Sequence, residues 1–133
     1  MMVLRGFLCL TCMLVCLTSN AQTTMDGNVL LKYCSAAVQH FNNDKSADMG
    51  AALWCLGYIT GFDSGQLVSA LEQNRLSNRK GERPSYLYCN PQGVTREQKI
   101  RIIVKHLQEH PQHLHSPAEI LVFQVLKTAF PCQ

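Results

Sequence analysis

The chain has 133 residues, of which 47% are hydrophobic and 16% are charged, and its formal net charge is +3. This length supports one modest hydrophobic core and not two. Its 12 basic and 9 acidic side chains are nearly balanced, so the chain lacks the concentrated positive charge by which proteins bind nucleic acids. The composition favours a small globular protein and argues against nucleic-acid binding.

Residues 1–21 have the organisation of a secretory signal peptide. Arg5 places a positive charge near the start, a short apolar run follows, and the small residues Ser19 and Ala21 mark a cleavage site. The apolar run is too short to span a membrane. We therefore expect an exported mature chain of residues 22–133, which forms a single helical domain and does not insert into the membrane.

Seven cysteines occur in the chain, but three of them lie in the predicted signal peptide. The four that remain are Cys34, Cys55, Cys89 and Cys132. An even number of cysteines in a small exported protein predicts disulfide bonds. Four cysteines allow three pairings, so their number alone does not choose among them.

Residues 26–41 are predicted to form the first helix, because their apolar residues recur at helical spacing and make one stripe. These residues are Leu30, Tyr33, Cys34, Ala37 and Phe41. A polar turn follows at residues 42–45, after which Ser46 or Asp48 can cap a second helix by accepting from its first N–H groups. A turn this short makes the two helices antiparallel neighbours.

The position of this turn also indicates how the cysteines pair. Cys34 lies as far before the turn as Cys55 lies after it, so the two should sit at the same height on facing helices. We therefore predict a Cys34–Cys55 disulfide. Cys89 and Cys132 are left to pair with each other, and this second bridge would join the middle of the chain to its C-terminus.

The stretch 51–71 is predicted to be the central helix, and Asp63 is its only ionised side chain. Gly57, Gly61 and Gly65 fall four residues apart, which places them on one face of a helix. Each interior glycine costs about 1 kcal/mol of helix propensity relative to alanine, so we expect a neighbouring helix to approach closely along this glycine seam. A membrane-spanning alternative is weaker, because the stretch carries several polar residues and no flanking basic cluster.

Residues 74–91 lose the apolar periodicity and are predicted to form an exposed arm. Arg and Tyr are enriched at the hot spots of protein interfaces, and the arm contains both. The candidate partner-binding residues are Arg75, Arg79, Arg83, Tyr86 and Tyr88. The alternative is a solvated connection without a partner. We expect all five side chains to be exposed, so that alanine at any of them leaves the fold intact.

Two further helices are predicted in the last third of the chain. Thr95 and Gln98 form a capping box at the start of the third helix, and Pro111 ends that helix. Ser116 and Glu119 form a second capping box, with a proline at the first helical position, where it is tolerated. The fourth helix is apolar almost all round and should be buried. The predicted fold is all-α, a small bundle of about four helices stapled by two disulfides.

Four histidines cluster around the turn between the third and fourth helices, namely His106, His110, His113 and His115. The four-residue spacing of the first two can place two imidazoles on one metal ion. The usual zinc signatures are absent, however, so we predict no metal site and no cofactor, and expect the imidazoles to bind terminal carbonyls of the helix. Every cysteine of the mature chain is assigned to a bridge, which leaves no thiolate nucleophile and no predicted catalytic residue.

Four segments in order resemble the Rap/Tai-type immunity proteins of bacterial type VI secretion. They are residues 55–61 (CLGYITG), residues 89–95 (CNPQGVT), residues 110–115 (HPQHLH) with Ala118, and residues 129–132 (AFPC). The resemblance extends from Cys34 to Cys132, nearly the whole predicted mature chain. The shared glycines, cysteines, prolines and caps are structural residues, so they say little about which toxin is bound.

The resemblance implies a small exported helical protein of the periplasm that is not an enzyme. Characterised members bind and inhibit peptidoglycan amidase effectors injected by other cells, and they commonly act as homodimers. Two alternatives stay open from the sequence: an envelope assembly or stress protein without a toxin partner, and a metal-dependent hydrolase that uses the histidines at 106–115. A fold transfers between relatives more safely than a function does.

Overall fold

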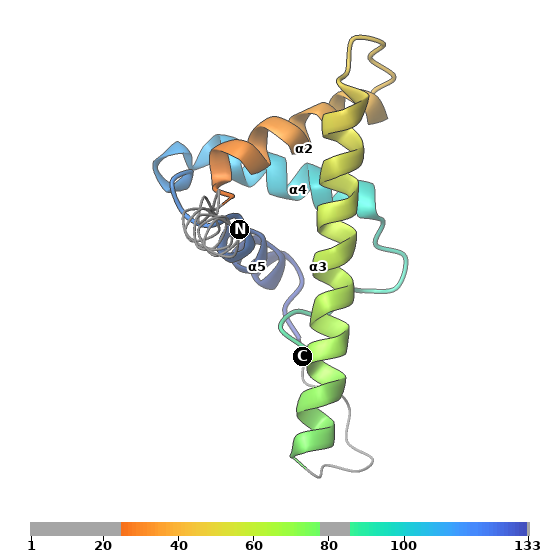
Figure 1. The fold of residues 1–133 in the computed structure, drawn as a ribbon, viewed down its shortest axis with the longest axis vertical. Helices are drawn as coiled ribbons and strands as arrows, with labels where there is room; N and C mark the ends of the chain where they lie inside the picture. Colours follow the sequence, from red (N-terminus) through yellow and green to blue (C-terminus); the bar gives the residue numbers. More distant parts are fainter. Residues whose placement is uncertain (1–24, 78–85, 133) are drawn as a thin grey trace, which may run out of the picture.

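The computed structural model describes residues 25–77 and 86–132, so the predicted signal peptide and the middle of the arm lie outside the described residues. Four α-helices occur in these ranges, together with a short 3-10 turn, η2, at Pro111–His113 (Figure 1). The α-helices are α2 (Gly27–Phe41), α3 (Met49–Leu76), α4 (Arg96–Glu109) and α5 (Ala118–Ala129). The all-α fold is confirmed.

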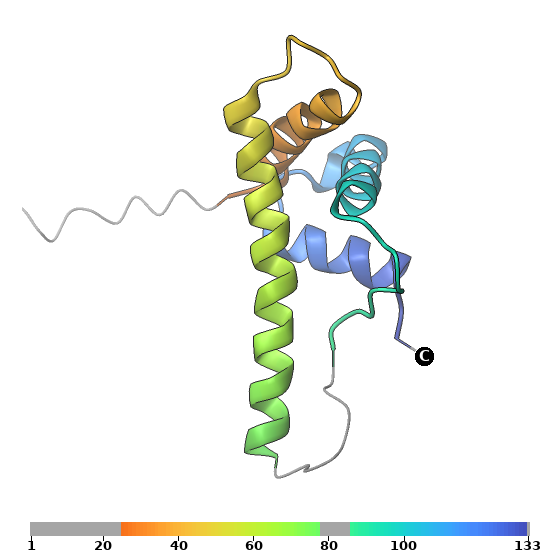
Figure 2. The same ribbon diagram turned by 90° about the vertical axis from the view of Figure 1, so that its right-hand side faces the viewer.

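The long helix α3 forms one side of the molecule, and the three shorter helices lie together on its other side (Figure 2). Helix α2 packs against both α3 and α4, and α4 in turn packs against α5. The last turns of α3 extend well past α5, so the C-terminal end of α3 projects from the body (Figure 1). No helix in the described ranges has the length and hydropathy that a membrane span requires.

Side-chain caps begin three of the four helices. The carboxylates of Asp26 and Asp48 accept from the third N–H of α2 and α3, each at 3.0 Å. The Thr95 hydroxyl accepts from Gln98 N–H at 3.1 Å, which confirms the predicted start of α4. The hydrogen bond from Val29 N–H lowers the pKa of Asp26. These contacts satisfy N–H groups that have no partner inside the helix.

Helix α5 begins differently from the prediction. Its cap position is Pro117, which makes no side-chain cap, so the predicted capping box at Ser116 is wrong. The Ala118 N–H donates instead to the Met25 carbonyl at 2.9 Å, and Gly27 N–H donates to the Ser116 carbonyl at 3.0 Å. The chain entering α2 therefore supplies a backbone acceptor for α5, and no side-chain cap is needed.

Both predicted disulfides are present. Cys34–Cys55 joins α2 to α3 with a Cα–Cα distance of 5.1 Å, and both residues are completely buried. Cys89–Cys132 joins the segment after the arm to the C-terminal end, with a Cα–Cα distance of 4.9 Å. The first bridge lies in the core, and the second lies at its edge.

The core is a single cluster that draws residues from all four α-helices. Its large members include Leu30, Ile59, Ile100, Leu107 and Leu126, each at most 1% exposed. Helix α5 buries one face only, since Ile120 is 45% exposed. The expectation that α5 is buried all round is therefore wrong, because no further helix covers its outer side in the part of the chain described.

The predicted glycine seam is also wrong. Gly57, Gly61 and Gly65 are all exposed, and a Cβ built on any of them meets nothing within 4 Å. The face of α3 that packs inward carries Ala52, Cys55, Ile59, Gln66 and Ala70. The partly buried rings of Trp54, Tyr58 and Phe62 also pack against the core, and the three glycines are left exposed.

Candidate functional site

The structure places three of the five predicted arm residues. Arg79 and Arg83 lie outside the described residues. Arg75 is exposed in the last turn of α3, and its Nε donates to Glu72 Oε2 at 2.7 Å. Tyr86 is exposed where the chain returns from the arm to the body. These two side chains remain accessible to a partner.

Tyr88 is completely buried, so its predicted exposure is wrong. Its ring stacks on Phe62 of α3, and its hydroxyl donates to Asp63 Oδ1 at 2.5 Å. Its backbone N–H donates to Gln66 Oε1 at 3.4 Å. The segment Tyr86–Cys89, which we call the return segment, is thereby fixed to α3, and Tyr88 is an anchor of the fold.

Asp63 and Lys99 form an ion pair at the centre of this anchor. Lys99 Nζ lies 2.6 Å from Asp63 Oδ2, and the lysine side chain is only 6% exposed, against 24% for the aspartate. Burial of the Tyr88 ring raises the pKa of its phenol, and the Asp63 carboxylate raises it further. The pair therefore links α3, α4 and the return segment through one carboxylate.

The sequence analysis did not predict that Lys99 pairs with Asp63. A signal for Asp63 was present, since it is the only ionised side chain in residues 51–71. An isolated charge in an otherwise apolar helix needs a partner when it is partly buried. Nothing local identified that partner, because Lys99 lies 36 residues further along the chain.

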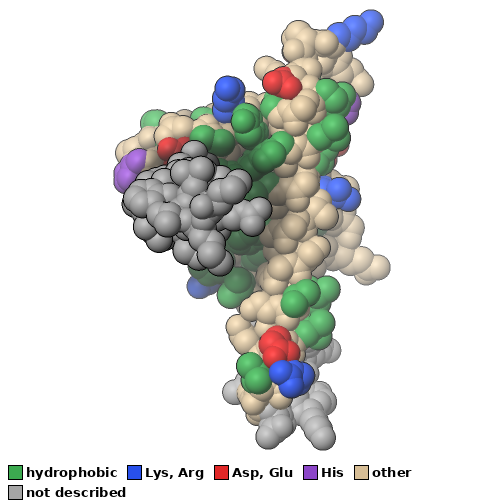
Figure 3. Space-filling model, in the orientation of Figure 1, with side chains coloured by type: hydrophobic (Ala, Val, Ile, Leu, Met, Phe, Trp, Pro, Cys, Tyr) green, Lys and Arg blue, Asp and Glu red, His purple; other side chains and the backbone are tan. Residues whose placement is uncertain are grey.

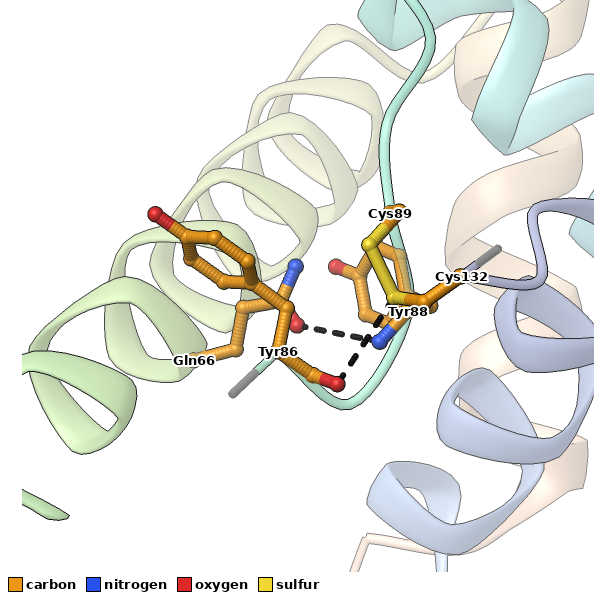
Figure 4. The surroundings of a disulfide bond; sticks show 5 residues. All are labelled: Gln66, Tyr86, Tyr88, Cys89 and Cys132. Carbon is orange, nitrogen blue, oxygen red and sulfur yellow. Dashed lines mark hydrogen bonds between the residues drawn. A yellow bond between two sulfur atoms is a disulfide. The ribbon is translucent and has the colours of Figure 1, made fainter. Parts of the chain in front are cut away.

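A cleft of about 390 Å³ opens between the C-terminal half of α3 and the return segment. Its lining includes Gln66 and Leu67 on one side and Tyr86, Cys89 and Asn90 on the other. Figure 4 shows Gln66 reaching toward the Tyr88 backbone, with the Cys89–Cys132 bridge beside them. The Cys132 sulfur lies 3.8 Å from the Tyr86 carbonyl oxygen. The cleft thus has an apolar side, an amide side chain and an exposed tyrosine.

The projecting end of α3 carries large apolar side chains that face solvent. Leu67 is 45% exposed and Leu71 is 51% exposed. Hydrophobic patches are visible there in Figure 3, close to one acidic and one basic side chain. Together with Arg75 and Tyr86, these two leucines form what we call the tip surface. Apolar, Arg and Tyr side chains in one exposed region are typical of a protein-binding surface.

A second exposed surface runs along the N-terminal half of α3, on the side that bears the glycines. Its members are Met49, Leu53, Gly57, Gly61 and Ser64, all exposed. We call this the open face. It carries no ionised side chain, because Asp63 turns toward Lys99. A Cβ built on Gly57 or Gly61 meets nothing within 4 Å, so no described residue packs on this face at the glycines.

The histidines form a stack at the end of α4. The rings of His106 and His110 lie 4.1 Å apart, and those of His110 and His113 lie 6.2 Å apart. His110 Nδ1–H donates to the His106 carbonyl at 2.8 Å, as expected for an imidazole that binds a terminal carbonyl. Burial lowers the pKa of His106. Within residues 25–77 and 86–132, no three or more His, Cys, Asp or Glu side chains are grouped so as to hold a metal ion.

Comparison with known proteins identifies a family that matches most of the chain. The family of Rap1a immunity proteins matches over residues 26–132, which covers all four α-helices and both disulfides. No curated protein and no solved structure matches the chain. The chain is a member of the Rap1a immunity protein family.

Proposed function

We propose that this protein is a periplasmic immunity protein that binds and inhibits a peptidoglycan amidase delivered by type VI secretion. Membership of the Rap1a immunity protein family carries the proposal, since that family implies protection against a secreted effector. Export is supported by the signal-peptide pattern of residues 1–21, and by two disulfides of the kind that persist in oxidising compartments.

An inhibitor of this kind needs no catalytic chemistry. It needs a rigid scaffold and a surface that excludes the substrate from the toxin. The two bridges and the buried Asp63–Lys99 pair supply the rigidity in this chain. We infer that the protein has no turnover of its own and uses no cofactor.

We assign effector binding to the tip surface, extended by Arg79 and Arg83 of the arm. Two observations support this assignment: the end of α3 projects from the body, and its leucines are exposed without a partner helix. A projecting apolar end can enter a concave site, and arginine and tyrosine beside it supply hot-spot contacts. Tyr88 is excluded from the surface, because it is completely buried.

The experiment is a binding and inhibition assay with a purified type VI peptidoglycan amidase, chosen first from any amidase gene found close to the gene for this chain. We expect a tight complex that stops peptidoglycan hydrolysis. Where a residue is a hot spot, alanine should cost about 2 kcal/mol of binding or more, roughly 30-fold in Kd. The variants are Leu71→Ala, Arg75→Ala, Arg79→Ala, Arg83→Ala and Tyr86→Ala.

Arg96→Ala is the matched control, since Arg96 is exposed at the start of α4, outside the tip surface. Melting curves verify that each variant is folded. If wild-type protein neither binds nor inhibits the amidase, the proposed function is wrong. If it binds but all five variants keep full affinity, the interface lies on another face.

We also propose that the protein is a homodimer whose two copies meet through the open face. In a two-fold dimer the same patch lies against itself, so any charge there would face a like charge. The open face has none. Its exposed glycines cost helix stability without any packing gain within the described protomer, and glycines allow two helix backbones to approach closely.

Sedimentation of Gly57→Arg and Ser69→Arg tests the dimer. Both changes add one positive charge to an exposed position of α3, but only Gly57 lies on the open face. Arginine also favours a helix more than glycine does, so Gly57→Arg should not unfold the protomer. We expect Gly57→Arg to be monomeric and Ser69→Arg to remain dimeric. If the wild-type protein is monomeric, the proposed homodimer is wrong. If Gly57→Arg is still dimeric, the open face is not the dimer interface.

A further inference from the structure

The two disulfides differ sharply in their access to solvent. Cys34 and Cys55 are both 0% exposed, enclosed between α2 and α3. Cys132 is exposed and Cys89 is half-buried, at the edge of the cleft (Figure 4). The chain therefore carries one sealed bridge and one bridge that solvent reaches in the folded state.

This difference decides which bridge can react. A disulfide opens when a thiolate attacks one of its sulfur atoms, so the reagent must reach that sulfur. For a completely buried bridge this requires prior local unfolding, which multiplies the rate by the small fraction of molecules that are open. An exposed bridge reacts without that penalty. Because Cys132 is an exposed residue, a reagent can approach this bridge in the native state.

We propose that Cys89–Cys132 is a site of thiol–disulfide exchange, open to dithiol reductants while the fold and Cys34–Cys55 stay intact. A reductant thiolate forms a bond to the Cys132 sulfur, the sulfur–sulfur bond breaks, and the electron pair leaves on the Cys89 sulfur, which then takes up a proton. The second thiol of the reductant, as thiolate, attacks the mixed disulfide. This releases the Cys132 thiolate and oxidises the dithiol to its own disulfide.

Several contacts survive when this bridge opens. Cys89 N–H donates to the Phe130 carbonyl at 2.9 Å, and Phe130 itself is buried. The Tyr88 ring and its hydroxyl remain held by α3. These contacts keep the return segment on the body, so exchange does not unfold the protein.

The contacts that depend on the bridge lie closer to the tip surface. The bridge holds the Cys132 sulfur 3.8 Å from the Tyr86 carbonyl, on the wall of the cleft. Opening it frees Cys132 to leave this position and removes one contact of the Tyr86 backbone. Exchange at Cys89–Cys132 therefore loosens the return segment locally and leaves the four helices in place.

The test is reduction of the full folded protein by dithiothreitol, with timed alkylation and peptide mapping of all four cysteines. We expect Cys89 and Cys132 to be alkylated at least about 100-fold faster than Cys34 and Cys55, because reaction of the core pair waits for unfolding. In denaturant the two bridges should open at similar rates. Equal rates in the native state, or earlier alkylation of Cys34 and Cys55, would overturn the proposal.

Hydrogen exchange of the partly reduced protein tests the structural consequence. Amide exchange should rise in residues 86–89 and stay unchanged in α2 and in the N-terminal half of α3. The double variant Cys89→Ala/Cys132→Ala should reproduce this pattern without any reductant. Unchanged exchange at 86–89 in both samples, or increased exchange throughout the helices, contradicts a local effect. Neither measurement uses an effector, so the result is independent of the proposed function.

Discussion

The Asp63 carboxylate joins two side chains that lie 25 and 36 residues away in the sequence. It accepts from the Tyr88 hydroxyl and from Lys99 Nζ, on opposite oxygens. A buried ion pair stabilises a fold only when its geometry and hydrogen bonds offset the loss of hydration. Removing one member leaves the other charge without a partner, and the cost depends on how deeply that remaining charge lies.

The two members of this pair should therefore respond unequally to substitution. Asp63→Asn leaves the nearly inaccessible Lys99 ammonium unpaired, and we expect a loss of about 3 kcal/mol or more in the free energy of unfolding. Lys99→Met leaves a carboxylate that is partly solvated and still bonded to Tyr88, so the loss should be smaller, about 1–2 kcal/mol. Urea unfolding of both variants measures which one loses more free energy of unfolding. A larger loss for Lys99→Met would show that the carboxylate is the less solvated partner.

Tyr88 offers a related test, because the sequence indicated an exposed residue and the structure shows a buried one. Tyr88→Ala removes a buried ring and should cost about 3–5 kcal/mol. Tyr88→Phe keeps the ring and removes one hydrogen bond, at about 1–2 kcal/mol. Tyr86→Ala is the control and should change stability by about 0.5 kcal/mol or less. Equal melting temperatures for Tyr88→Ala and Tyr86→Ala would show that Tyr88 is exposed, as the sequence indicated.

His106 makes the stability of the protein depend on pH. Burial and the neighbouring His110 lower the pKa of His106 in the folded state. On acidification the unfolded chain binds a proton at this histidine before the folded chain does, so folding stability falls. We expect a lower melting temperature at about pH 5.5 than at about pH 7.5, and a smaller difference in His106→Gln. An identical difference in wild type and variant would remove His106 as the cause.

At the scale of the helix, α3 shows how one pattern is compatible with three arrangements. Glycines spaced by four residues leave one face of a helix without side chains, whether that face meets its own chain, another chain or solvent. Among the residues that the structure describes, none lies within 4 Å of a Cβ built on Gly57, Gly61 or Gly65. By contrast, Gly27 at the start of α2 is tightly enclosed, since a Cβ there would lie 2.6 Å from Leu121 Cδ1 and 3.0 Å from the Leu114 backbone.

Alanine should therefore have opposite effects at these two kinds of glycine. Gly61→Ala should raise the free energy of unfolding by about 0.5–1 kcal/mol, through better helix propensity. Gly27→Ala should lower it by about 1–3 kcal/mol, because backbone and a core leucine must move. Thermal melts should be recorded at protein concentrations at which sedimentation shows a monomer. Dimerisation then does not contribute to the measured difference in stability. A destabilised Gly61→Ala monomer would mean that a part of the chain packs on this face.

At the scale of the whole molecule, the two bridges tie different parts of the fold. Their loops span sequence separations of 21 and 43 residues, and chain entropy alone gives each about 3–4 kcal/mol. Alanine in place of Cys34 and Cys55 also leaves a gap in the core, whereas alanine in place of Cys89 and Cys132 does not. We expect the core pair to be the more destabilising double substitution, measured by urea unfolding. The reverse order would mean that loop length outweighs packing.

The sequence alone determined those features that depend on local spacing. Apolar periodicity located the helices, Thr95 was correctly predicted to cap α4, and the equal distances of Cys34 and Cys55 from one turn indicated how the cysteines pair. The family was also recognisable, since its shared segments contain structural glycines, cysteines and prolines. Each of these features needs only a few neighbouring residues, so they can be predicted without knowing how the helices pack.

Only the tertiary structure decided which faces meet. It turned the glycines of α3 outward and Tyr88 inward, and it brought Lys99 to Asp63 from 36 residues away. It also gave α5 a backbone acceptor at Met25 in place of a side-chain cap. The α5 acceptor depends on how α5 meets the chain before α2, and the other outcomes depend on how α3 crosses α2, α4 and the return segment. A helix places several faces within reach of the core, and only packing against distant residues selects the one that is buried.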